Sequence, residues 1–306
     1  MVSEKPDWLQ AMFPWPQASL SVNGRRMAYI DEGPRDARPV LLLHGNPTWA
    51  FLYRDFVGPL TAAGYRVVAP DCIGSGYSDK PRIDAAYSLA HHIADLVSLI
   101  DQLDLQGVAI VGQDWGGPQG VGAALVRLHR VAAITLMNTW LDTDYKGRFH
   151  TGARPWTTWH APIIGPYFLK RLKALSHGGP AATTRRGMSA LEARGYHHVY
   201  DERESETVTL TWPRSIPLRE GDRGWADMAW IQSQLPRLAA IPIQLIWAPE
   251  DQVFPIEYAG RLKQLLPHAE GPTTYDAAAH FLQDDRGPEI AADIVGFLNR
   301  TVGPAA

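Results

Sequence analysis

The sequence has a single cysteine and no long apolar run, and each absence excludes a class of protein. Cys72 is the only cysteine among 306 residues, so an intrachain disulfide is impossible and a disulfide-stapled secreted scaffold is excluded. No apolar run approaches 18 residues, so we expect no membrane-spanning helix. Residues 1–17 lack a continuous apolar core, which predicts no signal peptide. Together these absences predict a cytoplasmic protein.

Neither sign of charge is in large excess. The net charge is −3, from 29 basic and 32 acidic side chains, and there is no basic run. We therefore expect no nucleic-acid partner and no attachment to an anionic membrane. The length and the 45% hydrophobic content suit one large domain with room for an inserted subdomain. The composition is also compatible with a homo-oligomer.

Short apolar segments alternate with amphipathic ones along most of the chain. Asn23 and Gly24 predict a type I′ turn between strands at 19–22 and 26–31. Helical spacing of apolar residues predicts a helix over 88–104. Further strands are expected at 39–43, 65–70, 108–111, 131–137, 241–247 and 271–276, with helices at 257–266 and near the C-terminus. This alternation predicts an α/β fold with a mainly parallel sheet, covered by helices on both faces.

The region from 139 to 225 has a different character. Prolines, glycines and tryptophans are scattered through it, and buried parallel strands disappear. We interpret residues 139–225 as a helical cap inserted over the sheet. Residues 1–138 and 226–306 then form the core domain.

The segment from Gly107 to Gly120, GVAIVGQDWGGPQG, predicts a sharp turn between a buried strand and a helix. It contains the pattern Gly-x-Asp-x-Gly at Gly112, Asp114 and Gly116. Small residues on both sides of the central position are typical of a nucleophile elbow, where larger side chains would collide. Here an aspartate occupies the position of the usual serine.

Four polar side chains follow predicted strands. They are Asn46, Asp114, Asp251 and His280. Because ligands of open α/β sheets bind outside the carboxyl ends of the strands, these residues should converge. The chain order Asp114, Asp251, His280 is that of nucleophile, acid and base in the α/β-hydrolases.

The residue types predict a reaction in two steps. Asp114 is ionised at neutral pH, so it needs no base to attack a tetrahedral carbon that bears a leaving group. The product is an alkyl ester on the enzyme. His280 then activates a water molecule that hydrolyses the ester, and Asp251 orients His280 and offsets its positive charge.

A departing anion needs hydrogen-bond donors. The indole N–H of Trp115 and the side-chain amide of Asn46 are the candidate donors to the leaving group. The backbone N–H groups of the same two residues are candidates for the oxyanion hole during ester hydrolysis.

Each assignment competes with an alternative. Asp114 and Asn46 could cap helices, and His280 could be a structural histidine. Asp251 competes with Glu250 and with an acid after the preceding strand, where the first carboxylate is Asp142. The remaining carboxylates near the histidine are expected to be solvated or capping: Asp276, Asp284 and Asp285.

Four motifs resemble those of the haloalkane dehalogenases. They are HGNPTW (44–49), GQDWGGPQG (112–120), WAPEDQVFP (247–255) and AAHFLQDD (278–285). An acid at Asp251 combined with the donors Asn46 and Trp115 resembles the third subfamily. The resemblance implies an α/β-hydrolase fold with a mostly parallel eight-stranded sheet and a helical cap. It implies a haloalkane substrate, water and a halide ion as partners, and no cofactor or metal.

The same pattern resembles the β-lactone decarboxylases of olefin biosynthesis, in which the aspartate acts on a β-lactone. Epoxide hydrolases share Asp-Trp-Gly but need cap tyrosines, and Asn46 argues against them. The candidate tyrosines are Tyr145, Tyr167, Tyr196 and Tyr200.

Three further classes of protein are less similar. Fluoroacetate dehalogenases have arginine where Trp115 stands, and Asp114 excludes serine esterases. A receptor without catalysis is the alternative from another class, and the complete residue set argues against it. The polar segment 197–211 matches the family poorly, which leaves the substrate range open.

Overall fold

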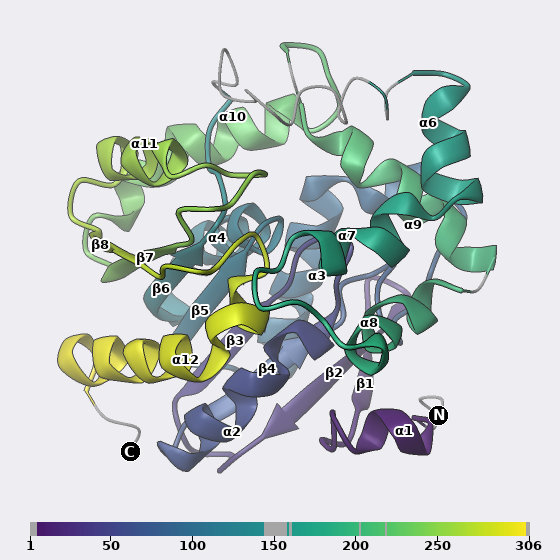
Figure 1. The fold of residues 1–306 in the computed structure, drawn as a ribbon. Helices are drawn as coiled ribbons and strands as arrows, with labels where there is room; N and C mark the ends of the chain where they lie inside the picture. The colour runs from purple at the N-terminus through teal and green to yellow at the C-terminus, as the bar shows by residue number, and fades with distance from the viewer. Residues whose placement is uncertain (1–4, 144–157, 159–160, 202, 218, 304–306) are drawn as a thin grey trace.

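The computed structural model describes residues 5–143, 158, 161–201, 203–217 and 219–303 (Figure 1). An eight-stranded sheet in the order β1-β2-β4-β3-β5-β6-β7-β8 forms its centre. The strands are β1 (Ala18–Val22), β2 (Arg25–Glu32), β3 (Pro39–Leu43), β4 (Arg66–Pro70), β5 (Val108–Gln113), β6 (Val131–Met137), β7 (Ile243–Trp247) and β8 (Glu270–Thr274). The β1–β2 and β2–β4 pairs are antiparallel and the others are parallel. The predicted α/β architecture with a mostly parallel eight-stranded sheet is confirmed.

Local sequence explains the edges of this sheet and its centre. Asn23 and Gly24 both have positive φ, at 48° and 79°, as a type I′ turn requires between β1 and β2. Strands β3 and β5 are buried along their whole length, which matches their unbroken apolar sequences. These central strands therefore need a helical layer on each face.

Helices cover both faces of the sheet (Figure 1). The helices outside the β6–β7 connection are α1 (Asp7–Gln10), α2 (Arg54–Ala62), α3 (Leu89–Gln102), α4 (Gly116–Val126), α11 (Glu257–Leu265) and α12 (Leu282–Thr301). Helices α2 and α12 contact each other, and α3 contacts α4. Ser88 caps the N-terminus of α3, where its side chain accepts the backbone N–H of His91. Helix α12 bends at Arg286, two residues before Pro288.

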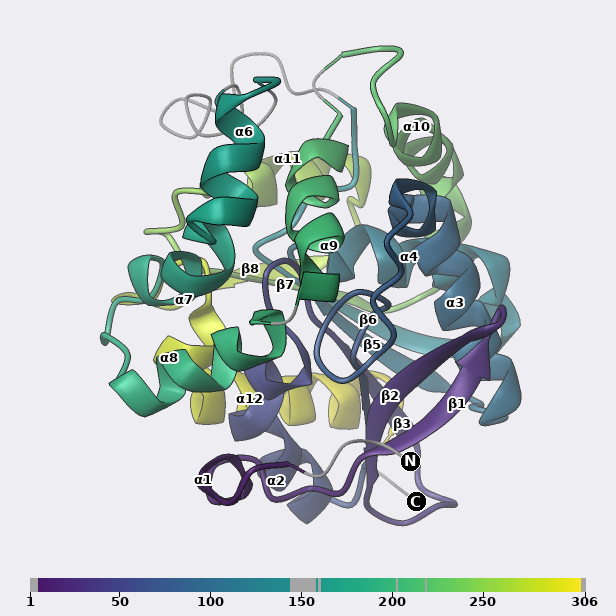
Figure 2. The same ribbon diagram turned by 90° about the vertical axis from the view of Figure 1, so that its right-hand side faces the viewer.

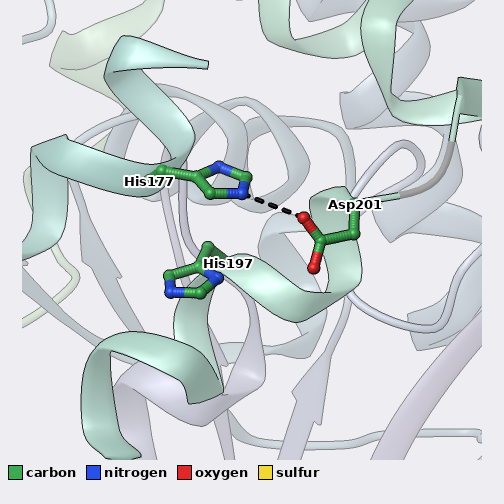
Figure 3. A group of neighbouring side chains, drawn as sticks. All are labelled: His177, His197 and Asp201. Carbon is green, nitrogen blue, oxygen red and sulfur yellow. Dashed lines mark hydrogen bonds and ion pairs between the residues drawn. The ribbon is translucent and has the colours of Figure 1, made fainter. Parts of the chain in front are cut away.

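Between β6 and β7 the described residues form helices and turns but no strand. The helices here are α6 (Ile164–Pro166), α7 (Gly179–Ala182), α8 (Ala190–His197), α9 (Glu206–Thr211) and α10 (Trp225–Gln234). Helices α6 to α9 gather on one side of the molecule, whereas α10 packs on α3 and α4 (Figure 2). The π-helical turn η5 (Ala174–Gly178) and the end of α8 bring His177, His197 and Asp201 together (Figure 3).

None of the helices in the described ranges combines the length and the apolar character that crossing a membrane requires.

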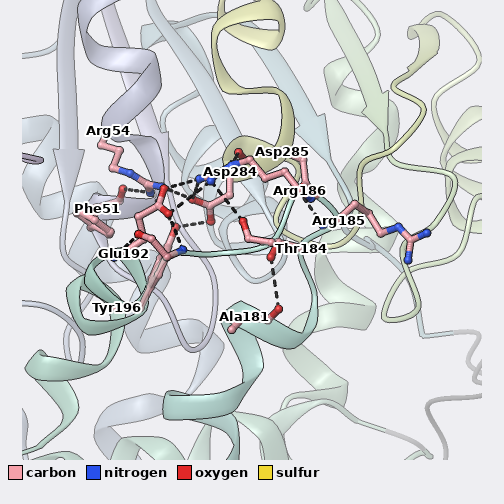
Figure 4. A network of polar contacts seen from close by, with 12 residues as sticks. Phe51, Arg54, Ala181, Thr184, Arg185, Arg186, Glu192, Tyr196, Asp284 and Asp285 are labelled. Atoms are coloured by element: carbon pink, nitrogen blue, oxygen red, sulfur yellow. Dashed lines mark hydrogen bonds and ion pairs between the residues drawn. The ribbon is translucent and has the colours of Figure 1, made fainter.

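A buried polar network joins α8 to the helices on one face of the core (Figure 4). The guanidinium of Arg54 contacts the carboxylates of Asp284 and Glu192. Tyr196 donates its hydroxyl to Asp284 at 2.6 Å. The expectation that Asp284 is solvated or capping was wrong, because its side chain is fully buried and ion-paired. The sequence pattern could not identify a partner 230 positions away.

The substitution Asp284→Asn should destabilise the protein because Arg54 would stay buried without its main carboxylate partner. We expect the free energy of unfolding to fall by about 3 kcal/mol, measured by urea unfolding. The matched control is Glu270→Gln, which breaks the exposed ion pair with Arg300. The control should lower the free energy of unfolding by less than about 1 kcal/mol. Equal losses in both variants would contradict the importance of the buried pair.

Candidate active site

Asp114 lies on a tight turn between β5 and α4, with φ of 53°. A Cβ atom on Gly112 would lie 2.4 Å from the carbonyl oxygen of Gly116, and one on Gly116 would lie 2.0 Å from that of Leu43. Neither position can hold a larger residue unless the backbone moves. The hydroxyl of Thr139 donates to the carbonyl of Asp114 at 2.6 Å, which fixes the turn from the neighbouring strand.

The structure brings Asp114, His280 and Asp251 together at the carboxyl ends of the strands. His280 Nδ1 is 3.0 Å from Asp251 Oδ2, and His280 Nε2 is 3.8 Å from Asp114 Oδ2. All three residues are buried. The competing acids lie elsewhere, since Glu250 pairs with Arg185 and Asp142 pairs with Arg261. Of the candidate acids, Asp251 is therefore the one that contacts His280.

Two side chains that we did not predict hold the backbone around His280. Asn138, directly after β6, donates its amide to the carbonyls of Ala279 and His280 at 3.0 and 3.2 Å. Gln113, at the end of β5, donates to the same His280 carbonyl at 3.1 Å. Both are polar residues at the carboxyl ends of buried strands, and this position in the sequence could have identified them as site residues.

Asp285 connects this loop to the helical region. Its Oδ2 accepts the backbone N–H of Ala279 at 3.0 Å. Its Oδ1 accepts the backbone N–H groups of Arg185 and Arg186 at 2.8 and 2.9 Å. One carboxylate therefore ties the segment between α7 and α8 to the residue that precedes His280.

The loop after β3 approaches the Asp114 carboxylate closely. The backbone N–H of Asn46 donates to Asp114 Oδ1 at 2.8 Å. A Cβ on Gly45 would lie 2.1 Å from the same oxygen. His44 supports the loop from beneath, because its Nε2 accepts the backbone N–H of Cys72 at 3.0 Å. This geometry supplies one of the two predicted oxyanion-hole donors.

Burial and the neighbouring charges shift the pKa values of Asp114 and His280 in opposite directions. Burial raises the pKa of Asp114 to about 6, although His280 and the backbone N–H groups of Asn46 and Trp115 favour the ionised form. Burial lowers the pKa of His280, but the carboxylates of Asp251 and Asp114 outweigh it, so that the pKa is raised overall. The histidine is therefore a stronger base than an isolated imidazole.

A small cavity of about 60 Å³ lies beside these residues. It is lined by Asn46, Pro47, Asp114, Trp115, Leu175, Gly179, Thr183, Ile216, Val253, His280 and Phe281. Both predicted leaving-group donors, Asn46 and Trp115, thus face the same space as Asp114. The Trp115 ring packs edge-on against Trp140, with 4.9 Å between the ring centroids. An apolar wall with few polar groups suits a small, weakly polar ligand.

A second, more open pocket of about 360 Å³ shares Thr183 and His280 with the cavity. It is lined mostly by polar residues, including Arg185, Glu250 and Gln252. His280 therefore lies between an apolar cavity and a polar opening.

The tyrosines considered for epoxide protonation do not line the cavity. Tyr200 donates its hydroxyl to the Thr48 carbonyl, and Tyr196 donates to Asp284. Tyr167 is exposed. Tyr145 lies outside the described residues. The three described tyrosines are thus not placed for that role.

Known proteins resemble this chain in sequence and in fold. The family profile for the alpha/beta hydrolase fold matches residues 38–153. A cis-3-alkyl-4-alkyloxetan-2-one decarboxylase of Shewanella oneidensis is 30% identical over 301 residues, covering 96% of this chain and 91% of the relative. A haloalkane dehalogenase of Mycobacterium marinum is 33% identical over 274 residues, covering 89% and 88%.

Solved structures are similar over nearly the whole chain. The haloalkane dehalogenase DbeA from Bradyrhizobium elkani superposes with a TM-score of 0.81 at 27% identity, covering 93% of this chain and 99% of that one. The tetrameric haloalkane dehalogenase DpaA from Paraglaciecola agarilytica gives a TM-score of 0.79 at 27% identity, covering 94% and 95%.

The raised pKa of Asp114 predicts a stability change for Asp114→Asn. The folded carboxyl binds its proton more tightly than the unfolded one, so ionisation costs stability as the pH rises through about 6. Asparagine cannot ionise, so the variant should be more stable than the parent at pH 8. At 1.36 kcal/mol per pKa unit, the gain is at most about 3 kcal/mol.

Urea unfolding at pH 8 and pH 4.5 measures this difference, which should shrink at the lower pH. The control is Asp36→Asn at an exposed position, which should change little at either pH. A variant at Asp114 that is less stable than the parent at pH 8 would show that desolvation does not dominate.

Proposed function

The chain belongs to the haloalkane dehalogenase family of the α/β-hydrolase superfamily, and on that premise we propose that it hydrolyses haloalkanes to an alcohol and a halide. The observation that carries the proposal is the shared cavity. Asp114, His280 and the side chains of Asn46 and Trp115 all line it. A carboxylate nucleophile, a base and two neutral donors in one apolar space suit displacement of a halide.

In the first step, Asp114 Oδ2 attacks the carbon that bears the halogen. Oδ1 is held by the backbone N–H of Asn46, which leaves Oδ2 on the side of His280. The new C–O bond forms as the carbon–halogen bond breaks, and the halide leaves with the bonding electrons. The indole N–H of Trp115 and the amide of Asn46 stabilise it, since both are donors without a formal charge.

In the second step, His280 Nε2 removes a proton from a water molecule that attacks Cγ of the ester. The negative charge that develops on Oδ1 is stabilised by the backbone N–H groups of Asn46 and Trp115. The alcohol leaves as the ester bond breaks, Asp114 is regenerated, and the net proton goes to solvent. The polar pocket on the far side of His280 is a route for this water.

The electrostatics suit this order of events. The ionised Asp114 raises the pKa of His280 in the resting enzyme. Alkylation neutralises Asp114 and removes that contribution. The pKa of His280 then falls, which favours the neutral imidazole when a base is required.

Residues 139–225 act as the cap that sets substrate size. Leu175, Gly179, Thr183 and Ile216 from this region form much of the cavity wall. These residues bound the space beside Asp114 into which a haloalkane would fit. In this assignment residues 1–138 and 226–306 form the core.

A second candidate is decarboxylation of a β-lactone at the same aspartate. The observation in its favour is the similarity to the Shewanella oneidensis decarboxylase, which extends over 96% of this chain. Epoxide hydrolysis is disfavoured by the positions of the described tyrosines, and a purely receptor role by the complete residue set.

Halide release distinguishes the two reactions. We expect release of bromide and chloride from short haloalkanes, faster for bromide because it is the better leaving group. Asp114→Asn should reduce the rate by at least about 10³-fold, because the nucleophile is lost. In parallel, a cis-β-lactone with two alkyl arms is supplied and alkene is sought by gas chromatography.

No halide release above that of the Asp114→Asn variant across bromo- and chloroalkanes of varied length would overturn the dehalogenase proposal. Alkene formation in its place would establish the second candidate.

Substitution of His280 by phenylalanine should trap the intermediate. The first step does not need His280, whereas hydrolysis does, so the alkyl ester should accumulate on Asp114. Intact-protein mass spectrometry should show the mass of one alkyl group. The double variant Asp114→Asn with His280→Phe is the control and should gain no mass. An unmodified His280→Phe protein, when the parent consumes the same substrate, would contradict the two-step scheme.

A further inference from the structure

His177, His197 and Asp201 form a compact group in the region between β6 and β7, apart from the cavity (Figure 3). His177 lies in the turn η5 and His197 ends helix α8. Asp201 follows the short turn η6 (His198–Tyr200). One ligand atom from each residue lies within 4.8 Å of those of the other two. Among the described residues this is the one group of histidine, cysteine and acidic side chains close enough to hold a metal ion.

Two of its three residues, His197 and Asp201, fall within the polar segment 197–211 that matches the family pattern poorly. His197 and Asp201 are four positions apart on consecutive helical turns, so both side chains project to the same side. The turn η5 packs against α8 and brings His177 to that side. Figure 3 shows His177 above His197, with Asp201 beside both. The arrangement therefore joins two segments about 20 positions apart.

The two imidazoles lie side by side, and one ring would have to rotate to point its nitrogen at an ion bound by the other. Their rings stack with centroids 4.5 Å apart and planes 14° from parallel. His197 Nδ1 is buried and has no hydrogen-bond partner among the described residues. An imidazole nitrogen without another partner is available to bind a metal ion.

Asp201 and Ser176 complete the surroundings. His177 Nε2 lies 2.9 Å from Asp201 Oδ1, and its Nδ1 lies 3.1 Å from Ser176 Oγ. With Nε2 on a metal, Nδ1–H would donate to the buried Ser176 hydroxyl. An outer hydrogen bond of this kind orients a metal-bound histidine.

We propose that His177, His197 and Asp201 bind a Zn²⁺ ion, with water completing the coordination. Two imidazoles and one carboxylate are a ligand set that suits Zn²⁺. Mg²⁺ and Ca²⁺ prefer oxygen ligands and should not bind here. The site lies outside the proposed catalytic group, so it stands whatever reaction the enzyme carries out.

Lys173 competes with a metal ion for the carboxylate of Asp201. Its Nζ lies 3.2 Å from Asp201 Oδ1 and also donates to the Asp201 carbonyl. Zn²⁺ can use this carboxylate only when the ammonium group moves away. Lys173 has a long, partly exposed side chain, so this movement disturbs no packed core. Binding therefore exchanges one cation for another at Asp201.

The ion would also brace the cavity wall. Leu175 lies in the same turn as His177 and lines the cavity beside Asp114, as does Gly179. A metal ion that links η5 to residues 197–201 would keep η5, and with it Leu175, packed against α8. We therefore expect Zn²⁺ to raise the midpoint of thermal unfolding.

The test is titration of the full-length, EDTA-dialysed protein with ZnCl₂ by isothermal calorimetry. We expect one Zn²⁺ per chain in the parent protein. His177→Ala and His197→Ala should each weaken binding by more than about tenfold. The matched control is His268→Ala, which removes an exposed histidine elsewhere and should leave the affinity unchanged. MgCl₂ in place of ZnCl₂ should give no binding.

Lys173→Met separates a metal site from a merely structural cluster. Methionine keeps an unbranched side chain, one atom shorter, but removes the competing charge, so Zn²⁺ should bind more tightly than to the parent. The rise in the thermal midpoint with Zn²⁺ should be larger in this variant and absent in Asp201→Asn. Asp201→Asn provides a ligand change at an exposed position if a histidine variant fails to fold.

The proposal is overturned if the parent binds no Zn²⁺, or if the histidine variants bind it as tightly as the parent does. Weaker binding in Lys173→Met would also overturn it, because it would make the lysine a support rather than a competitor.

Discussion

The removal of the Asp114 carboxylate from water is the constraint on which the rest of the site depends. A buried carboxylate is costly unless donors and a positive charge surround it. The backbone N–H of Asn46 and the ring of His280 supply them, and Asp251 supports His280 in turn. In the proposed reaction the same desolvation would make the carboxylate a better nucleophile, so its cost to stability and its reactivity would have one cause.

The groups that stabilise the Asp114 carboxylate are positioned by the whole sheet. Asp114 and its supports come from the ends of β3, β5, β6 and β7 and from the loop after β8, so none can be placed without the parallel pairing of the strands. Asn138 shows the dependence clearly. Its side chain binds the backbone of the His280 loop and also accepts the N–H of Ala248 after β7. The strand ends are thus joined by side-chain hydrogen bonds as well as by the backbone hydrogen bonds of the sheet.

Local sequence patterns predicted the parts of the molecule that local physics determines. The Gly112–Asp114–Gly116 pattern predicted the elbow because steric exclusion acts between near neighbours, and Asn23-Gly24 predicted a hairpin for a similar reason. Contacts between distant segments could not be predicted in this way. The burial of Asp284 depends on Arg54, and the hold of Asn138 on the His280 loop depends on how β6 and that loop pack together. Those outcomes are set by tertiary packing, which no short window of sequence contains.

Asp285 gives the molecule a mechanical property that neither of its two regions has alone. It holds the backbone of Arg185 and Arg186 with one oxygen and that of Ala279 with the other. A displacement of the segment between α7 and α8 therefore pulls on the residue next to His280. The segment after α7, which also contributes Thr183 to the cavity wall, and the loop that carries His280 are therefore joined through a single carboxylate, and a shift of one would move the other.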